Sequence, residues 1–301
     1  MKVWNFRVQS APMFCSYDLH NHSTASDGTL QPAALVRLAV EAGVEVLALT
    51  DHDSTEGIEE ARQAAVSAGI TLIPGAEISV TWNKQTLHIV GLNLDIACGP
   101  LQQGLAGLRA FRERRAREIG ERLERAGIGG AYAGARALSN GHLISRTHFA
   151  RYLVQVGAAV DLRQVFKRFL VQGKPGHVAG QWASLEEAVA WIHAAGGQAV
   201  LAHPARYNLT RSKLRRLLRE FVALGGDALE VVSGSHSRDD YQVMARYARE
   251  FGLLASAGSD FHSPENPWIA LGRLPQLPEG CRPIWGDWPA LRQAPTFAQA
   301  H

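Results

Sequence analysis

Short apolar segments alternate with amphipathic helices along most of this chain, and this alternation constrains the fold more than any other feature. The segment 44–50 (VEVLALT) is almost continuously apolar, as expected of a strand that is covered on both faces. Repeated strand–helix units imply parallel strands joined by right-handed crossovers. The pattern predicts about seven strands, at residues 13–17, 44–50, 70–73, 87–92, 198–202, 228–232 and 253–257.

The alternation is interrupted between residues 100 and 180, where no clear strand pattern is found. Helices are expected there at 101–127, 146–156 and 161–170. We therefore expect a helical insertion at 100–180 within a discontinuous barrel domain. The complete predicted division is an N-terminal extension at 1–12, a barrel at 13–99 and 181–285, the insertion at 100–180 and a tail at 286–301. Met13 is an alternative start to Met1.

The long helix of the insertion is rich in charge on one face. Seven arginines alternate with glutamates along it, and such a face is usually solvated and held by salt bridges. We expect that arrangement for Arg109, Arg112, Arg114, Arg115, Arg117, Arg122 and Arg125.

Polar residues follow one predicted strand after another. His20 and His22 come just after the first strand, and residues two apart in an extended chain point to the same side. They can therefore hold one metal ion, and Asp27 lies in a turn that can bring a carboxylate to the same place. A single histidine at a strand end is usually structural. However, the carboxyl ends of such strands form the active site of barrel folds, and further candidates occur there at His52, Glu77, His203, Asp260 and His262.

The motifs around these residues resemble those of the polymerase and histidinol phosphatase (PHP) superfamily of metal-dependent phosphoesterases. The resemblance covers nearly the whole chain and implies an α/β fold, a distorted (β/α)7 barrel, consistent with the strand count. Its closest branch acts on 3′,5′-nucleoside bisphosphates and shares the SRTHF stretch at 145–149 and a helical insertion. The matching motifs are DLHNH at 18–22, SDG at 26–28, TDHD at 50–53, GAE at 75–77, HIVGL at 88–92, AHP at 202–204 and SDFH at 259–262.

This resemblance implies a metal centre of two or three divalent ions. Six imidazoles and three carboxylates without a thiolate suit manganese best, although zinc and iron(II) also fit. The expected nucleophile is a hydroxide held by the metals, with no protein nucleophile. One ion would be held by His20, His22, Glu77 and Asp260, a second by Glu77, His88 and His203, and a third by Asp27, His52 and His262. Asp51, Asp53 and His236 are either hydrogen-bond partners that orient these imidazoles or ordinary turn residues.

Substrate selection is expected from basic residues in and near the insertion: Arg146, His148, Lys174 and Arg206. The leading hypothesis is a phosphatase that removes the 3′-phosphate of nucleoside 3′,5′-bisphosphates such as adenosine 3′,5′-bisphosphate. The main alternative is a 5′→3′ exonuclease that acts on short RNA or DNA with the same metals. A histidinol phosphate phosphatase and an inactive PHP module remain less favoured alternatives.

Composition limits the other classes of function. The chain has 301 residues, 46% of them hydrophobic, and a formal net charge of +3 that does not indicate a nucleic-acid coat protein. No apolar run has the length of a membrane span, and we expect neither membrane association nor an obligate protein partner. Cys15, Cys98 and Cys281 show no pairing pattern, which favours a reducing, cytoplasmic compartment.

Overall fold

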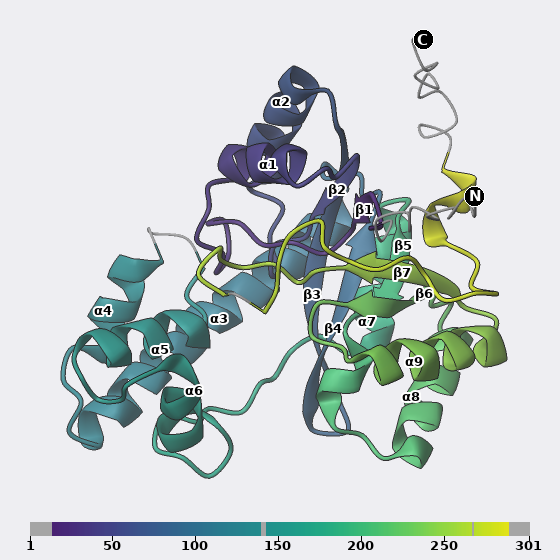
Figure 1. Ribbon diagram of the computed structural model, residues 1–301. Helices are drawn as coiled ribbons and strands as arrows, with labels where there is room; N and C mark the ends of the chain where they lie inside the picture. Colours follow the sequence, from purple (N-terminus) through teal and green to yellow (C-terminus); the bar gives the residue numbers. More distant parts are fainter. Residues whose placement is uncertain (1–13, 140–142, 267, 289–301) are drawn as a thin grey trace, which may run out of the picture.

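A nearly closed barrel of strands forms the body of the computed structural model, which describes residues 14–139, 143–266 and 268–288 (Figure 1). Within these residues, seven strands form one sheet in sequence order. The first and last strands are brought together by a hydrogen bond of 2.9 Å from Leu19 N to Ala257 O. The predicted barrel is thus confirmed. The strands are β1 Tyr17–Asp18, β2 Val46–Leu49, β3 Thr71–Trp82, β4 Gln85–Leu92, β5 Gln198–Leu201, β6 Ala228–Ser233 and β7 Leu254–Gly258.

The prediction that all strands are parallel was wrong at β4, which runs antiparallel to both β3 and β5. The strand predicted at 70–73 continues to Trp82, and Asn83 and Lys84 then reverse the chain. Both turn residues have positive φ, 46° and 63°, as a tight two-residue hairpin requires. A hairpin needs no crossover helix, so the alternation of strands and helices in the sequence did not indicate that β4 is antiparallel.

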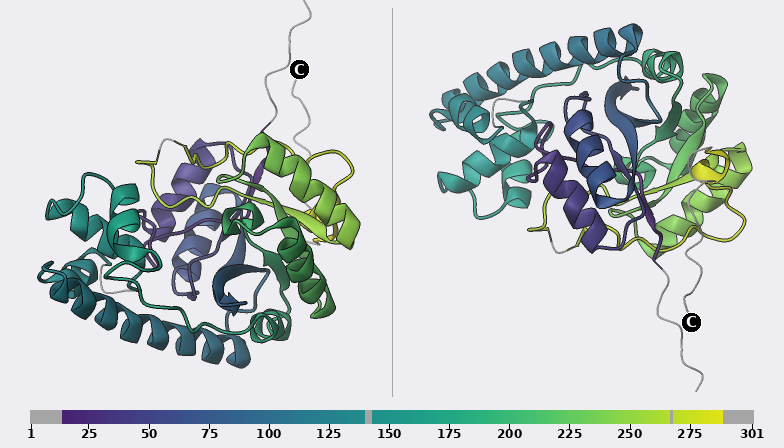
Figure 2. Two further views of the ribbon diagram at one scale, coloured as in Figure 1. Left: turned by 90° about the horizontal axis from the view of Figure 1, so that it is seen from below. Right: turned by 90° about the horizontal axis from the view of Figure 1, so that it is seen from above.

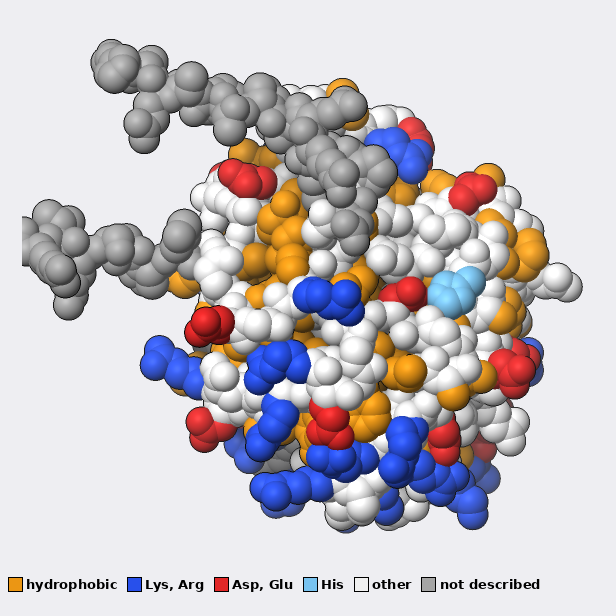
Figure 3. All heavy atoms as spheres, turned by 90° about the vertical axis from the view of Figure 1, so that its right-hand side faces the viewer, with side chains coloured by type: hydrophobic (Ala, Val, Ile, Leu, Met, Phe, Trp, Pro, Cys, Tyr) orange, Lys and Arg blue, Asp and Glu red, His pale blue; other side chains and the backbone are white. Residues whose placement is uncertain are grey.

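Five helices pack around the outside of the barrel (Figures 1 and 2). Ser184 and Glu187 form a capping box at the start of one of them, α7 (Leu185–Ala194). The helices are α1 Pro32–Glu41, α2 Ile58–Ala68, α7 Leu185–Ala194, α8 Arg211–Ala223 and α9 Arg238–Phe251, with short turns η2 Pro204–Tyr207 and η3 Ile284–Asp287. The outer face of α8 is basic, and Figure 3 shows Lys and Arg side chains gathered on that side of the molecule.

The chain between β4 and α7 forms a helical layer at one side of the barrel (Figure 2). Its apolar cluster includes Leu123, Phe149 and Leu153 and is distinct from the clusters of the barrel. This separate core begins at Ala116, whereas Leu101, Leu105 and Leu108 of the same helix belong to the barrel core, and the insertion boundaries 100–180 stay a proposal. The elements are α3 Gly99–Arg125, α4 Ala131–Leu138, α5 Arg146–Gln155, α6 Leu162–Val165 and the π-helical turn η1 Phe166–Leu170.

Three predicted features of the chain ends lie outside the described residues: the extension 1–12, Met13 and the tail beyond residue 288. Among the described helices, none has both the length and the apolar character needed to cross a membrane.

Candidate metal centre

The barrel brings all nine candidate ligands to one end. Most follow a strand directly, whereas Glu77 and His88 lie within the antiparallel pair β3 and β4. His20 and His22 follow β1, and their backbones are fixed by β7 and its loop, since His22 N donates to Phe261 O and Asp260 N to His20 O, both at 2.9 Å. Seven of the nine are buried, and the other two, His88 and His262, are partly exposed.

Glu77 occupies the middle of this group. Its side chain is fully buried, and five imidazoles surround its two carboxylate oxygens. A carboxylate has about four lone-pair sites, so hydrogen bonds from all five rings cannot satisfy this arrangement. It fits a carboxylate that bridges metal ions. The nearest nitrogens lie at 2.8 Å in His52 and His88, 3.0 Å in His203, and 3.3 Å in His20 and His22.

Ligand atoms within 4.8 Å of one another form four overlapping groups. The expected third site appears as one group, in which His22 joins Asp27, His52 and His262. His203 groups with His20 and Glu77, whereas His88 groups with His52 and Glu77. The fourth group is His20, His22 and Asp260.

Unpaired polar atoms support a metal here. Seven buried side-chain atoms have no hydrogen-bond partner among the described residues, and all seven belong to the candidate ligands. Leaving such an atom unpaired costs about 1–3 kcal/mol, so a cluster of them indicates a missing binding partner. The atoms are His20 Nε2, His22 Nε2, Asp27 Oδ1, His52 Nδ1, Glu77 Oε2, His88 Nδ1 and His203 Nδ1.

The protonation states of three of the candidate ligands, His22, His88 and Glu77, also suit metal binding. Burial lowers the pKa of His22 to about 3 and that of His88 to about 4, so both rings are neutral and keep a lone pair for a metal. Burial alone would raise the pKa of Glu77, but the nearby imidazoles of His88, His52 and His20 hold it well below its ordinary value. The carboxylate is therefore ionised near neutral pH.

Glu230 in β6 also belongs to the site, although the sequence pattern did not predict it. It is 2% exposed, its Oε1 lies 3.1 Å from His20 Nδ1, and its Oε2 accepts a hydrogen bond from the backbone N–H of His203. A carboxylate on Nδ1 fixes the ring so that Nε2 faces Glu77. The only sequence signal was an acidic residue inside the apolar run ALEVVS.

Replacing Glu230 by glutamine is expected to weaken manganese binding by about 10- to 100-fold, because the amide holds the His20 ring less firmly. Isothermal titration of metal-free protein measures the affinity. Glu250→Gln is the matched control, because Glu250 pairs with Arg215 on the outer surface. Equal affinities in the two variants would show that Glu230 does not act through the metal ligands.

The three residues predicted to orient the ligand rings make no direct hydrogen bond to a candidate ligand ring in the described structure. Asp51 accepts from Ser23 and Ser26, and Ser26 Oγ lies 3.4 Å from His22 Nδ1. Asp53 accepts from Ser79 N and from Arg112. The imidazole of His236 faces backbone groups of Val231 and Ala205. Their orienting role stays a prediction, and only Asp51 has a short path to a candidate ligand.

A cavity of about 190 Å³ opens beside the candidate ligands. Arg112, Arg115, Arg146 and Arg206 also line this cavity. The prediction of a solvated arginine face on α3 was wrong for two of these residues, because Arg112 and Arg115 are only 8% and 9% exposed. Arg112 donates to Asp53 and Ser79, and Arg115 donates twice to Val178 O. Helical spacing alone could not reveal that barrel residues contact Arg112 and that the segment around Val178 contacts Arg115.

The four predicted substrate-binding residues differ in position. Arg146 lines the cavity, and its guanidinium lies 5.8 Å from the Phe166 ring without a carboxylate partner among the described residues. Arg206 also lines it and is ion-paired with Asp260. His148 is buried, and its Nδ1 accepts from Ser145 N at the start of α5. Lys174 is exposed, and neither His148 nor Lys174 is among the residues that line the cavity.

The family model described as the PHP domain matches residues 18–199, and this chain belongs to the PHP domain family. Two relatives show how it is placed within that family. It is 50% identical to a 3′,5′-nucleoside bisphosphate phosphatase of Chromobacterium violaceum over 271 residues, 90% of this chain and 95% of the relative. It is 48% identical to the 5′-3′ exoribonuclease Rnm of Escherichia coli over 274 residues, 90% of this chain and 93% of the relative.

Solved structures agree with this placement. The fold matches an amidohydrolase from Chromobacterium violaceum, determined with bound sulfate and no metal, with a TM-score of 0.87 and 50% identity over 90% of this chain and 95% of that chain. It also matches a protein from Bifidobacterium adolescentis with a TM-score of 0.77 and 27% identity, covering 91% of this chain and 94% of that chain.

Proposed function

We propose that this protein is a metal-dependent phosphatase that hydrolyses the 3′-phosphate of nucleoside 3′,5′-bisphosphates, such as adenosine 3′,5′-bisphosphate. The observation that carries the proposal is a single cavity lined by six of the nine candidate metal ligands and by four arginine guanidinium groups. A substrate with two phosphates fits this arrangement, because one phosphate can bind at the metal ligands and the other at a guanidinium group. The relative from Chromobacterium violaceum, which is named for the same activity, supports the assignment.

Two or three divalent ions would be held by the nine ligands, and the nitrogen and oxygen donors favour manganese. Ions in such a site lower the pKa of water and neutralise phosphate oxygens. The protein side chains supply the geometry around them. Glu230 and the strand ends fix the ligands, while Arg206 beside Asp260 places a positive charge at the edge of the cluster. We place the reaction in the cytoplasm, because the three cysteines are free thiols.

Arg146 is the proposed anchor for the phosphate that is not transferred. Its guanidinium is partly buried and lacks a carboxylate partner among the described residues, and burial with the nearby Arg112 lowers its pKa. A phosphate dianion would relieve the repulsion between these cations. Binding energy at this remote phosphate can hold the reacting phosphoryl group in line. We therefore assign the 5′-phosphate to Arg146 and the 3′-phosphate to the metals.

Replacing Arg146 by alanine is expected to raise KM for adenosine 3′,5′-bisphosphate roughly ten- to hundredfold, because a charge-assisted phosphate contact contributes about 1.5–3 kcal/mol. A generic aryl phosphate has no second phosphate and should be much less affected. Steady-state kinetics on both substrates measure the difference, with Lys174→Ala as the control outside the cavity. An equal effect on the kinetics of both substrates would show that Arg146 acts on the transferred phosphoryl group or stabilises the fold.

A 5′→3′ exonuclease activity on short RNA is the second candidate, supported by relatives named 5′-3′ exoribonuclease at 48% and 49% identity. A pocket for a nucleotide 5′-phosphate also accepts the end of an oligonucleotide. The complete set of candidate ligands argues against an inactive module.

Phosphate release decides between an enzyme and an inactive module. Protein freed of metal by chelation is expected to release no phosphate from adenosine 3′,5′-bisphosphate, and added manganese should restore turnover best. Adenosine 3′-monophosphate, which lacks the anchor, should be a much poorer substrate. Full activity in the metal-free protein would contradict the proposal.

A further inference from the structure

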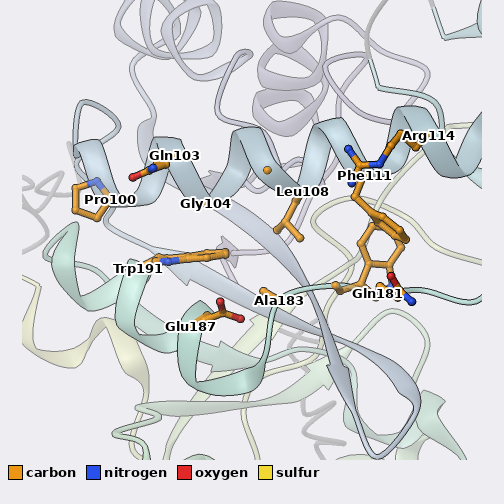
Figure 4. Close-up of a pocket in the computed structure, with 12 residues that line it drawn as sticks. Pro100, Gln103, Gly104, Leu108, Phe111, Arg114, Gln181, Ala183, Glu187 and Trp191 are labelled. Carbon is orange, nitrogen blue, oxygen red and sulfur yellow. The ribbon is translucent and has the colours of Figure 1, made fainter.

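A second and larger cavity, of about 500 Å³, lies between α3 and α7. Figure 4 shows Trp191 against α3 at Gly104, with Phe111 extending from the same helix toward Gln181 and Arg114 lying along the helix beside Phe111. The proposed phosphatase reaction makes no use of this space. Its volume is that of an ordinary small-ligand site.

Trp182 lines both cavities. Its indole N–H donates to Thr86 Oγ1 at 3.0 Å. Thr86 and the candidate ligand His88 are two residues apart on β4 and thus point to the same face. Two residues of a strand span about 7 Å, so the second cavity begins close to the metal centre.

The position of Arg146 determines how a nucleic-acid strand would be oriented in the catalytic cavity. At one end, Thr147 donates to Asp27 Oδ2 at 3.0 Å, which places the start of α5 and its Arg146 beside the group of Asp27, His52 and His262. Trp182 follows His88 along the cavity wall through Thr86, and Arg112 and Arg115 lie over its ring at 4.9 and 5.5 Å. A 5′-phosphate held by Arg146 would therefore direct the 3′ continuation of a strand toward Trp182.

The lining of the second cavity suits nucleotides. The Phe111 and Trp182 rings meet edge to face at 4.8 Å, and a Cβ on Gly104 would come within 2.5 Å of the Trp191 ring, so that ring packs directly on α3. Arg114 lies 5.8 Å from Phe111 and has no carboxylate partner in the described part of the chain. Aromatic rings with a nearby cation are the usual platform for single-stranded nucleic acid.

We propose that this cavity binds the nucleotides that follow the scissile linkage of a 5′-phosphorylated RNA. The proposal rests on the second candidate function, exonuclease activity at the same metal centre. A free bisphosphate ends at the metals and does not enter the second cavity. The cavity would thus add affinity for oligonucleotides without changing the phosphatase reaction.

Gly107 allows a direct test. It lines the cavity and is exposed, and a Cβ added there would meet no atom within 4 Å. Gly107→Trp should fill the cavity without disturbing the fold, and Gly107→Ala is its control. Arg114→Glu places a repelling charge at the rim, and Arg125→Glu, at the far end of α3, is the matched control.

Kinetics with manganese would compare adenosine 3′,5′-bisphosphate with a 5′-phosphorylated RNA pentanucleotide. Gly107→Trp and Arg114→Glu are expected to lower kcat/KM for the RNA by roughly five- to hundredfold, the range of one lost stacking contact. Hydrolysis of the bisphosphate should stay within about twofold, as should both activities of the controls. Binding is followed in parallel by fluorescence anisotropy, with a labelled RNA whose first linkage is a phosphorothioate that slows cleavage.

Equal losses on both substrates, or no loss of RNA binding, would overturn the cavity's role. If the wild-type protein hydrolyses the bisphosphate but neither binds nor cleaves the RNA, the cavity proposal fails and the phosphatase proposal stands. If neither substrate is hydrolysed, the proposed function fails, and the anisotropy of the variants still decides whether the cavity binds RNA.

Discussion

Replacing Glu77 by glutamine is expected to lower phosphate release by about a thousandfold or more. Glu77 is the carboxylate that faces five imidazoles, and the neutral amide cannot bridge two cations in its place. Metal ions contribute several kcal/mol to such reactions, and each 1.36 kcal/mol corresponds to a tenfold change in rate. Steady-state kinetics with manganese and metal analysis by mass spectrometry measure the loss of rate and of bound ions.

The fold should survive this substitution, because the apolar core rather than the metal centre accounts for most of the buried apolar surface. A circular dichroism spectrum unlike that of the wild type would mean that the lost activity reflects unfolding. The control Glu250→Gln should keep both activity and metal content. Near-normal turnover in Glu77→Gln would contradict the bridging role.

Replacing Arg112 by alanine is expected to lower the free energy of unfolding by about 3–5 kcal/mol, the usual cost of removing one partner of a buried ion pair. Arg112 Nε lies 2.6 Å from Asp53 Oδ2, and its other donor reaches Ser79 Oγ at 2.7 Å. Without Arg112, the carboxylate of the fully buried Asp53 loses its ion-pair partner. Urea denaturation of the metal-free protein, followed by circular dichroism, measures the change.

Arg117→Ala on the same helix is the matched control. Arg117 pairs with Glu113 at the surface, and exposed pairs of this kind contribute about 0–1 kcal/mol. A loss in Arg112→Ala as small as that in Arg117→Ala would show that Arg112 does not hold α3 to the barrel.

The sequence was sufficient to predict the barrel and the residues at its strand ends. Alternating apolar strands and helices define parallel units, and the carboxyl ends of such strands must lie together. For this reason His20, His52 and Asp260 could be expected in one place although up to 240 positions separate them. The structure brings them together.

Other features depend on contacts that no local pattern records. The reversed strand β4 follows from the positive φ angles of Asn83 and Lys84, which the strand pattern does not reveal. Arg112 and Arg115 have the spacing of a solvated helix face, but the barrel residues Asp53 and Ser79 bind Arg112, and the Val178 carbonyl binds Arg115. Glu230 contacts His203, which follows the neighbouring strand β5, and His20, which is 210 positions away in the chain.

The identity of the phosphate that leaves is the central claim, and phosphorus NMR of adenosine 3′,5′-bisphosphate incubated with the manganese-loaded protein tests it most directly. The two phosphate resonances can be followed separately as inorganic phosphate forms. We expect the 3′-phosphate signal to disappear while adenosine 5′-monophosphate accumulates. Accumulation of adenosine 3′-monophosphate would contradict the assignment of the 5′-phosphate to Arg146 and of the 3′-phosphate to the metals.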